Sequence, residues 1–170
     1  MKNQNPFKLF LVTLAILAMY TSTVSADDGV IRFTNVAMKQ VVKVDAKGEK
    51  TIEYIEPKTA IPGDIIRYDI GFENISNQEV SNIVVNNPIP NNSKYRDNSA
   101  TGKHTEISFS VDGNTFAEPS KLVLKDNTGK TWLATAEQYK HIRWVYKKPL
   151  PPGAKSTVSF MTEIKKPGDD

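Results

Sequence analysis

The chain has 170 residues, of which 22 are basic and 19 acidic, and it contains no cysteine. The absence of cysteine excludes disulfides, cysteine-ligated zinc, thiol catalysis and an amino-terminal lipidated cysteine. The nearly balanced charge argues against nucleic acid and anionic membranes as partners, because both attract dense positive patches.

The first 26 residues have the pattern of a secretory signal peptide. Lys2 and Lys8 precede an apolar run at 10–19, and small residues follow up to Ala26. A charged head, an apolar centre and a small-residue exit are typical of such a peptide, and the run is about half as long as the roughly 20 residues of a spanning helix. We therefore expect cleavage after Ala26 and an exported mature chain, residues 27–170, without a membrane anchor. Loss of the two lysines leaves this mature chain with a net charge of +1.

Apolar and polar residues alternate in several segments of the mature chain, which predicts strands with one buried face. The expected strands, in chain order, are 41–44, 51–55, 64–74, 83–85, 107–111, 122–124, 141–147 and 156–164. In the third of these segments the residues expected to share a face are Ile66, Tyr68, Ile70 and Phe72. Only the segment 133–138 tolerates a helix.

Turn residues separate these segments. Proline presets one backbone dihedral and glycine permits another, so tight turns are expected at 62–63, 112–113, 128–129 and 152–153. The stretch 86–93 is too rich in asparagine and proline for a central strand. Short strands with regular turns and no internal repeat predict one all-β domain over residues 27–170, an antiparallel β-sandwich, with a small barrel as the alternative.

One ordered set of motifs lies between residues 62 and 100. A Pro-Gly-Asp turn opens a strand with a central aromatic, an asparagine ends that strand, and a proline-rich turn precedes another aromatic. The positions concerned are Pro62, Gly63, Asp64, Tyr68, Asn74, Val84, Pro88, Pro90 and Tyr95. In this order they resemble the conserved repeat domain of bacterial cell-surface proteins, a family of unknown function, and 150–164 is similar to its closing turn and strand.

The resemblance implies an immunoglobulin-like sandwich and brings no active site with it. Two departures from the family pattern stand out. Asn87 occupies the position where the family usually has an aspartate before the first proline. The family also usually occurs as tandem copies, whereas this chain holds one copy, which weakens the case for a spacer role.

The sequence offers no catalytic, metal-binding or cofactor-binding constellation, and we predict that the protein is not an enzyme. His104 and His141 are the only histidines, no Gly-x-Ser-x-Gly elbow accompanies them, and His141 is expected to face solvent. Asp126, with Asn127 and Gly129 nearby, resembles the first part of a calcium loop. A β-turn explains that segment better. Lys39 and Lys43 have no asparagine or aspartate partner in the final strand for an isopeptide crosslink.

The two tryptophans are predicted to lie in different environments, one in the core and one at the surface. Trp144 shares a face with Ile142 and Tyr146 and is expected in the core, whereas Trp132 follows Thr131 and is expected at the surface. The candidate ligand surface therefore consists of Trp132 and of the amides in the asparagine-rich loop, Asn91 and Asn92.

We expect an exported, non-catalytic immunoglobulin-like module with a structural or protein-interaction role at the cell envelope. Its location is the periplasm, the cell surface or the medium, and its expected partners are other envelope or surface proteins. The alternative is a carbohydrate- or small-ligand-binding module. A sandwich with an open edge strand would favour partnering by strand addition. Lysines near strand ends are interpreted as guards of exposed edges, namely Lys147, Lys148, Lys165 and Lys166.

Overall fold

A computed structural model describes residues 30–169, and the predicted signal peptide lies outside these residues. The strands are β1 (Ile31–Val44), β2 (Lys50–Ile55), β3 (Ile65–Asn74), β4 (Val84–Pro88), β5 (Ser93–Tyr95), β6 (Thr101–Gly102), β7 (Thr105–Ser110), β8 (Val123–Lys125), β9 (Thr131–Leu133), β10 (His141–Tyr146) and β11 (Lys155–Ile164). Two short 3-10 helices, η1 (Pro119–Lys121) and η2 (Ala136–Gln138), are the helical elements of this part of the chain. Neither has the length or the apolar character that a membrane crossing requires.

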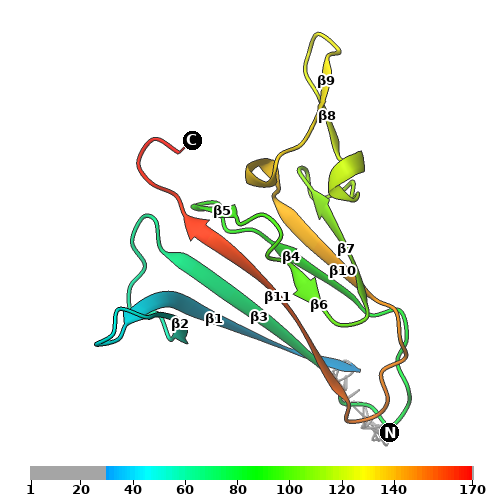
Figure 1. Ribbon diagram of the computed structural model, residues 1–170. Coiled ribbons are helices and arrows are strands. Elements are labelled where there is room, and N and C mark those ends of the chain that lie inside the picture. Colours follow the sequence, from blue (N-terminus) through cyan, green and yellow to red (C-terminus); the bar gives the residue numbers. More distant parts are fainter. Residues whose placement is uncertain (1–29, 170) are drawn as a thin grey trace, which may run out of the picture.

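Two antiparallel sheets form the body of the fold and face each other (Figure 1). The larger sheet has the order β2-β1-β3-β11-β5, with β6 also paired to β11, and the smaller sheet has the order β4-β10-β7. Strands β8 and β9 form a separate hairpin that extends from one end of the molecule. The predicted all-β antiparallel sandwich is confirmed.

The register of β3 against β11 explains why the alternating residues of β3 all face the core. Ile70 lies opposite Val158, and Tyr68 lies opposite Phe160 with the two rings stacked at 4.9 Å between centroids. A slip of one residue would move every one of these side chains to solvent, so the hydrophobic pattern fixes the register. The predicted inner face of this segment is confirmed.

Trp144 occupies the centre of the core, between the two sheets. Its side chain is fully buried, its ring lies 6.0 Å from that of Phe160, and its Nε1 donates to the carbonyl oxygen of Thr101 at 3.1 Å. Burial of a large apolar side chain contributes roughly 1.5–3 kcal/mol, and the hydrogen bond removes the cost of burying the indole N–H. The prediction that Trp144 is a core residue is confirmed.

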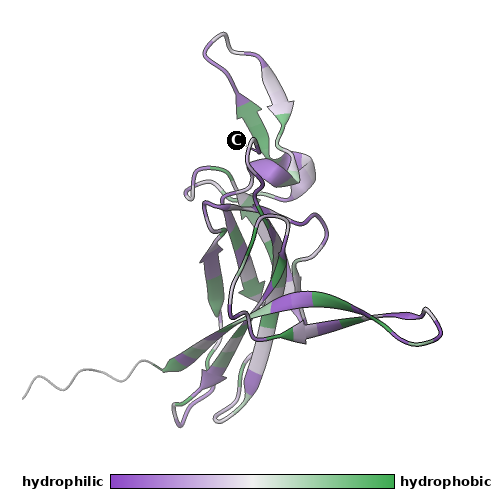
Figure 2. Ribbon diagram, turned by 90° about the vertical axis from the view of Figure 1, so that its left-hand side faces the viewer, coloured by the Kyte–Doolittle hydropathy of each residue, from purple (hydrophilic) through white to green (hydrophobic). Residues whose placement is uncertain are grey.

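Strand β1 is longer than predicted, because it begins at Ile31 instead of residue 41. Its residues 31–39 pair with β3, whereas residues 39–44 pair with β2. The second half of β1 and β2 therefore leave the sandwich as a two-stranded hairpin, residues 40–55, which we call the arm. Figure 2 shows the arm extending sideways from the two packed sheets.

Two other sequence predictions concern the ends of elements. The stretch 86–93 forms no central strand, because β4 ends at Pro88 and lies at the edge of the smaller sheet. The helix-tolerant segment holds η2, where the backbone N–H of Thr135 donates to Oε1 of Gln138 at 3.0 Å. Both predictions are confirmed.

The interpretation of the late lysines as edge guards is wrong. Strand β10 is the central strand of the smaller sheet, and β11 is paired on both sides. Lys147 and Lys165 follow these two strands directly, so they flank interior strands and not exposed edges.

Candidate functional site

Asp64 connects the turn at Pro62 and Gly63 to the neighbouring strand. Its Oδ2 accepts hydrogen bonds from the backbone N–H of Ile61 at 2.8 Å and from Nζ of Lys39 at 2.6 Å. Gly63 has a φ of +90°, a conformation that favours glycine. The ammonium of Lys39, and after it the N–H of Ile61, lower the pKa of Asp64 because both stabilise the carboxylate. This turn is therefore a structural anchor for β3.

The Lys39–Asp64 contact also bears on an isopeptide crosslink. The final strand has no asparagine or aspartate partner for Lys39, but the structure places Asp64 beside it at the start of β3. Amide formation with loss of water requires a neutral amine and a protonated acid. The lowered pKa keeps Asp64 ionised, so the two groups form an ion pair and no crosslink is expected.

Asn74 and Tyr95 likewise have structural contacts. Asn74 is completely buried, and its Nδ2 donates to the carbonyls of Gln78 and Leu150, both at 2.7 Å. Tyr95 is buried against Tyr139, and its hydroxyl accepts the backbone N–H of Ala100 at 2.9 Å. Between Pro88 and Pro90, Ile89 is buried. These motif residues hold loops onto the sandwich.

The two histidines lie in different surroundings. His104 is exposed with a φ of +60°, and desolvation followed by the charges of Lys148 and Lys103 lowers its pKa. His141, predicted to face solvent, is half-buried: its Nδ1 is buried without a hydrogen-bond partner and its ring lies against Gly113. In the turn at Asp126, Oδ1 of this residue accepts hydrogen bonds from Thr128 and Lys130 of the same turn. Within residues 30–169 no group of three or more histidine, aspartate or glutamate side chains is placed to hold a metal ion.

A first candidate surface is a hollow of about 750 Å³ below the β8–β9 hairpin, which we call the end hollow. Trp132, expected at the surface, is 41% exposed and lines this hollow. The polar part of the lining includes Lys94, Thr135, Glu137, Gln138 and Asp169. An exposed aromatic face beside hydrogen-bonding side chains is an arrangement that suits a sugar or a small polar ligand.

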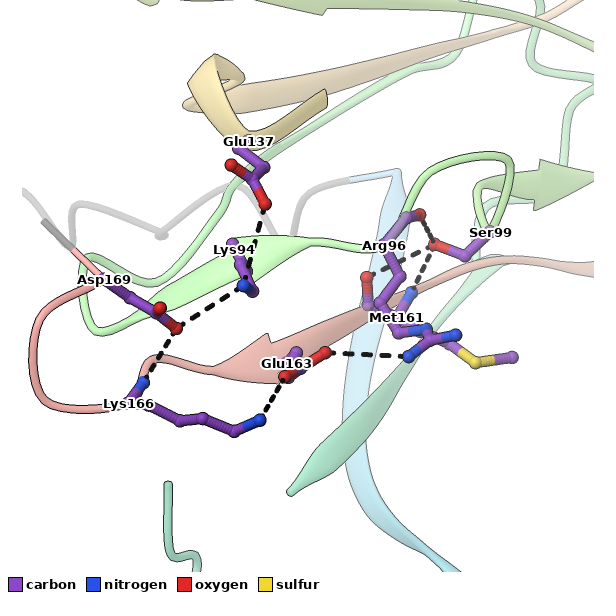
Figure 3. A network of polar contacts seen from close by, with 8 residues as sticks. All are labelled: Lys94, Arg96, Ser99, Glu137, Met161, Glu163, Lys166 and Asp169. Atoms are coloured by element: carbon purple, nitrogen blue, oxygen red, sulfur yellow. Dashed lines mark hydrogen bonds and ion pairs between the residues drawn. The ribbon is translucent and has the colours of Figure 1, made fainter. Parts of the chain in front are cut away.

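Lys94 organises one wall of the end hollow (Figure 3). Its Nζ lies 3.6 Å from Oε1 of Glu137 and 3.4 Å from Oδ2 of Asp169, which joins η2 to the carboxyl-terminal segment. The backbone N–H of Lys166, and then Lys94, lower the pKa of Asp169. Lys94 is therefore already engaged by two carboxylates before any ligand enters.

The asparagine-rich loop does not join Trp132 in the end hollow. Asn91 and Asn92 are exposed, and neither lines the hollow. The carbonyl oxygen of Asn92 accepts the backbone N–H of Lys165 at 2.9 Å, which fixes the loop against the end of β11. The structure thus separates the predicted ligand surface into two parts.

A second candidate surface lies between the two sheets at the β1 side, and sequence reasoning missed it. We call it the edge groove. It has a volume of about 420 Å³, its floor comes from the larger sheet and its wall from β4, and the main lining residues are Phe33, Asn35, Ile70, Val84, Val85 and Asn86. No charged side chain lines the part of the groove that the structure describes.

The edge groove exists because the larger sheet extends past the smaller one. Phe33 lies opposite Phe72 in the register of β1 and β3, so it points to the inner face of the sheet. It is nevertheless 52% exposed, because the smaller sheet ends at β4 within the described residues and leaves it uncovered. One further strand beside β4 would cover Phe33.

The outer edge of β4 has backbone groups available for such a strand. Ile83 accepts a hydrogen bond from the N–H of Tyr146, and the N–H of Ile89 donates to Lys140, so the odd-numbered residues of β4 face β10. By alternation, the N–H and C=O of Val84 and Asn86 point outward, where no strand of residues 30–169 pairs with them.

Pro88 closes one end of this free edge. It has no N–H, and its carbonyl accepts Nδ2 of Asn87 at 2.7 Å. The free edge of β4 is therefore a short stretch of backbone centred on Val85.

Comparison with protein-family models, with curated proteins and with solved structures finds no match to this chain. The end hollow and the edge groove therefore have to be assigned from their own geometry and chemistry.

Proposed function

We propose that the chain is an exported, non-catalytic immunoglobulin-like module with a structural or protein-interaction role at the cell envelope. The observation that carries the proposal is the edge groove, where an uncovered Phe33 lies beside the unpaired backbone of Val84 and Asn86. A strand from a partner protein pairs with such an edge, and its alternate side chains fill the groove. The signal-peptide pattern and the resemblance to a cell-surface repeat family support the envelope as the place of action.

The polar and apolar parts of the edge groove indicate the kind of segment it binds. Hydrogen bonds from Val84 and Asn86 supply sequence-independent affinity, because every extended chain offers the same backbone groups. Phe33 and Ile70 at the floor select apolar side chains at every second residue of the partner. The uncharged lining disfavours a strand with charged residues at those positions.

A matched pair of variants at Asn86 tests this proposal. Asn86→Pro removes the outward N–H at an edge position, where proline is tolerated, and both Asn86→Pro and Asn86→Ala lose the side-chain contact with Arg143. A photocrosslinking residue at Val84 of the full chain in the producing cell should yield a defined adduct with an envelope protein. The adduct should persist in Asn86→Ala and vanish in Asn86→Pro. Equal yields from both variants, or no adduct at all, would contradict strand addition.

The end hollow supports a second candidate function, the binding of a carbohydrate or another small ligand. Trp132 supplies an exposed aromatic face, and Thr135, Glu137 and Gln138 supply hydrogen-bonding groups around it. On a glycan array, Trp132→Ala should lose the signal of the unmodified chain, whereas Trp132→Phe should retain most of it because a ring face remains. A signal unaffected by Trp132→Ala would exclude the end hollow as the binding site.

A further inference from the structure

We propose that the edge groove of one molecule receives the arm of a second copy, so that the protein assembles head to tail. This inference rests on the proposed strand addition and names the partner.

The shape of the edge groove excludes the simplest self-association. Two copies could pair their β4 strands about a two-fold axis, since Val84 and Asn86 are symmetrically placed around Val85. In that arrangement the overhanging β1 of each copy would occupy the space of the larger sheet of the other. The groove therefore accepts a strand that has no second sheet packed beneath it.

The arm is such an element, and it carries an uncovered apolar face. Val42 and Ile52 are cross-strand partners, so their side chains lie on the same face, and each is 56% exposed. Val44 follows two residues after Val42 on that face and is also exposed. The charged residues Lys43 and Glu53 pair with each other at 2.7 Å on the opposite face. Lys50, the cross-strand partner of Val44, lies at one end of this face, so its uninterrupted apolar part consists of Val42 and Ile52.

The dimensions and charge of the two surfaces agree. Strand β2 has six residues and an outer edge without a partner in the described chain, and β4 has five residues. At about 3.3 Å per residue these strands are roughly 20 and 17 Å long. An uncharged groove floored by Phe33 fits the face formed by Val42 and Ile52, and burying both surfaces removes the largest uncovered apolar groups of β1 from water.

A molecule cannot fill its own groove with its own arm. Phe33 and Val42 belong to one continuous strand, and nine residues of extended chain separate them by about 30 Å. The contact is therefore intermolecular and uses two different surfaces. Such a heterologous contact leaves one free arm and one free groove at the ends of every open assembly. It therefore produces a filament or, when the rotation closes, a ring.

Complementation between two defective variants provides the test. The arm variant carries Val42→Lys and Ile52→Lys, and the groove variant carries Phe33→Lys and Asn86→Pro; all four positions are exposed, and thermal melting checks that both proteins fold. Sedimentation velocity of the chain from residue 27 onward should show species that grow with concentration. Each variant alone should sediment as a monomer, with self-association weakened by about tenfold or more.

An equimolar mixture of the two variants should form a one-to-one dimer and nothing larger, because only one intact arm and one intact groove remain. Val36→Lys, another exposed apolar position on β1 that belongs to neither surface, should assemble like the unmodified chain. Monomers in the mixture, or assembly that persists in either variant alone, would overturn the head-to-tail contact. An unmodified chain that stays monomeric would also overturn it, while an adduct from Val84 to a different protein would leave the proposed strand addition standing.

Discussion

Replacing Asn74 by alanine is the sharpest test of how the loops are held to the sandwich. Asn74 ends β3 and is completely buried. Its Nδ2 donates to the carbonyls of Gln78 and Leu150, and its Oδ1 accepts the N–H and the hydroxyl of Ser76 at 3.0 and 2.7 Å. The substitution removes all four hydrogen bonds at once.

The expected loss of unfolding free energy depends on which hydrogen bonds the partner groups of Asn74 retain. In the variant the single hydroxyl proton of Ser76, no longer donated to Asn74, is free for the carbonyl of Gln78 at 3.0 Å, and the carbonyl of Leu150 still accepts the N–H of Val80 at 3.1 Å. Neither carbonyl is left without a donor, so the loss is that of three to four bonds, at about 1 kcal/mol each. We expect Asn74→Ala to lower the free energy of unfolding by roughly 3–4 kcal/mol.

Urea unfolding followed by circular dichroism measures this loss. With a slope of about 2 kcal/mol per molar urea, the midpoint should fall by roughly 1.5–2 M. Asn91→Ala is the matched control, because the side chain of Asn91 is exposed and the change should stay within about 0.5 kcal/mol. A midpoint for Asn74→Ala that falls no further than the control would refute the reasoning.

Asn74→Asp adds a dependence on pH. A carboxylate oxygen in place of Nδ2 would face the carbonyls of Gln78 and Leu150, now 2.7 Å from Nδ2, and repulsion would raise its folded-state pKa. The penalty is absent below the unfolded pKa of about 3.9 and grows as the pH rises above it. This variant should therefore be less stable than Asn74→Ala at neutral pH and should recover in acid.

Three further changes test the turns. The stabilisation from Asp64 is complete above the ordinary carboxyl pKa of 3.8 and is lost as the pH falls through its lowered folded-state pKa. Thermal melts of Asp64→Asn should therefore show a weaker loss of stability in acid than those of the unmodified chain. The intact mass of the unmodified chain should show no loss of roughly 18 Da from an amide between Asp64 and Lys39. Gly113→Ala should destabilise by about 1–2 kcal/mol in urea titrations, because φ is +80° and the new Cβ would lie 2.9 Å from Cε1 of His141; Gly153→Ala, which has open space, should cost less. Millimolar calcium or EDTA should move the melting temperature by less than about 1 °C, because Oδ1 of Asp126 already accepts three hydrogen bonds within its own turn.

The core strands were predictable because burial on one face leaves a two-residue period in the sequence. That period is clear in β3, β10 and β11, which lie in the interior of their sheets. Strand β1 carries a weaker signal. Asn35 interrupts the inner face between Phe33 and Ala37, and the inner side of this stretch is only partly covered. The smaller sheet does not cover this part of β1, which creates the edge groove. For the same reason the sequence of β1 lacks the regular alternation of apolar and polar residues that would have predicted the strand.

The candidate surfaces were harder to predict than the strands. The exposure of Trp132 follows from its polar neighbours, but the end hollow brings it together with Lys94 and Asp169, which are distant in sequence. The local hydrophobic periodicity of a sequence carries no information about such contacts between distant segments. The partial burial of His141 similarly depends on Gly113, a residue of a turn that lies against its ring.

The free edge of β4 is unusual in how little protects it. Exposed edges template aggregation, and proteins blunt them with charge, short strands or proline. Strand β5 is short at three residues, and β2 bears Lys50 and Glu53. Strand β4 has proline at one end only, and Val84 is 44% exposed. An uncharged edge beside an uncovered phenylalanine favours aggregation unless another strand covers it. The weak protection of this edge therefore favours a β4 strand that is paired with another strand in the functional protein.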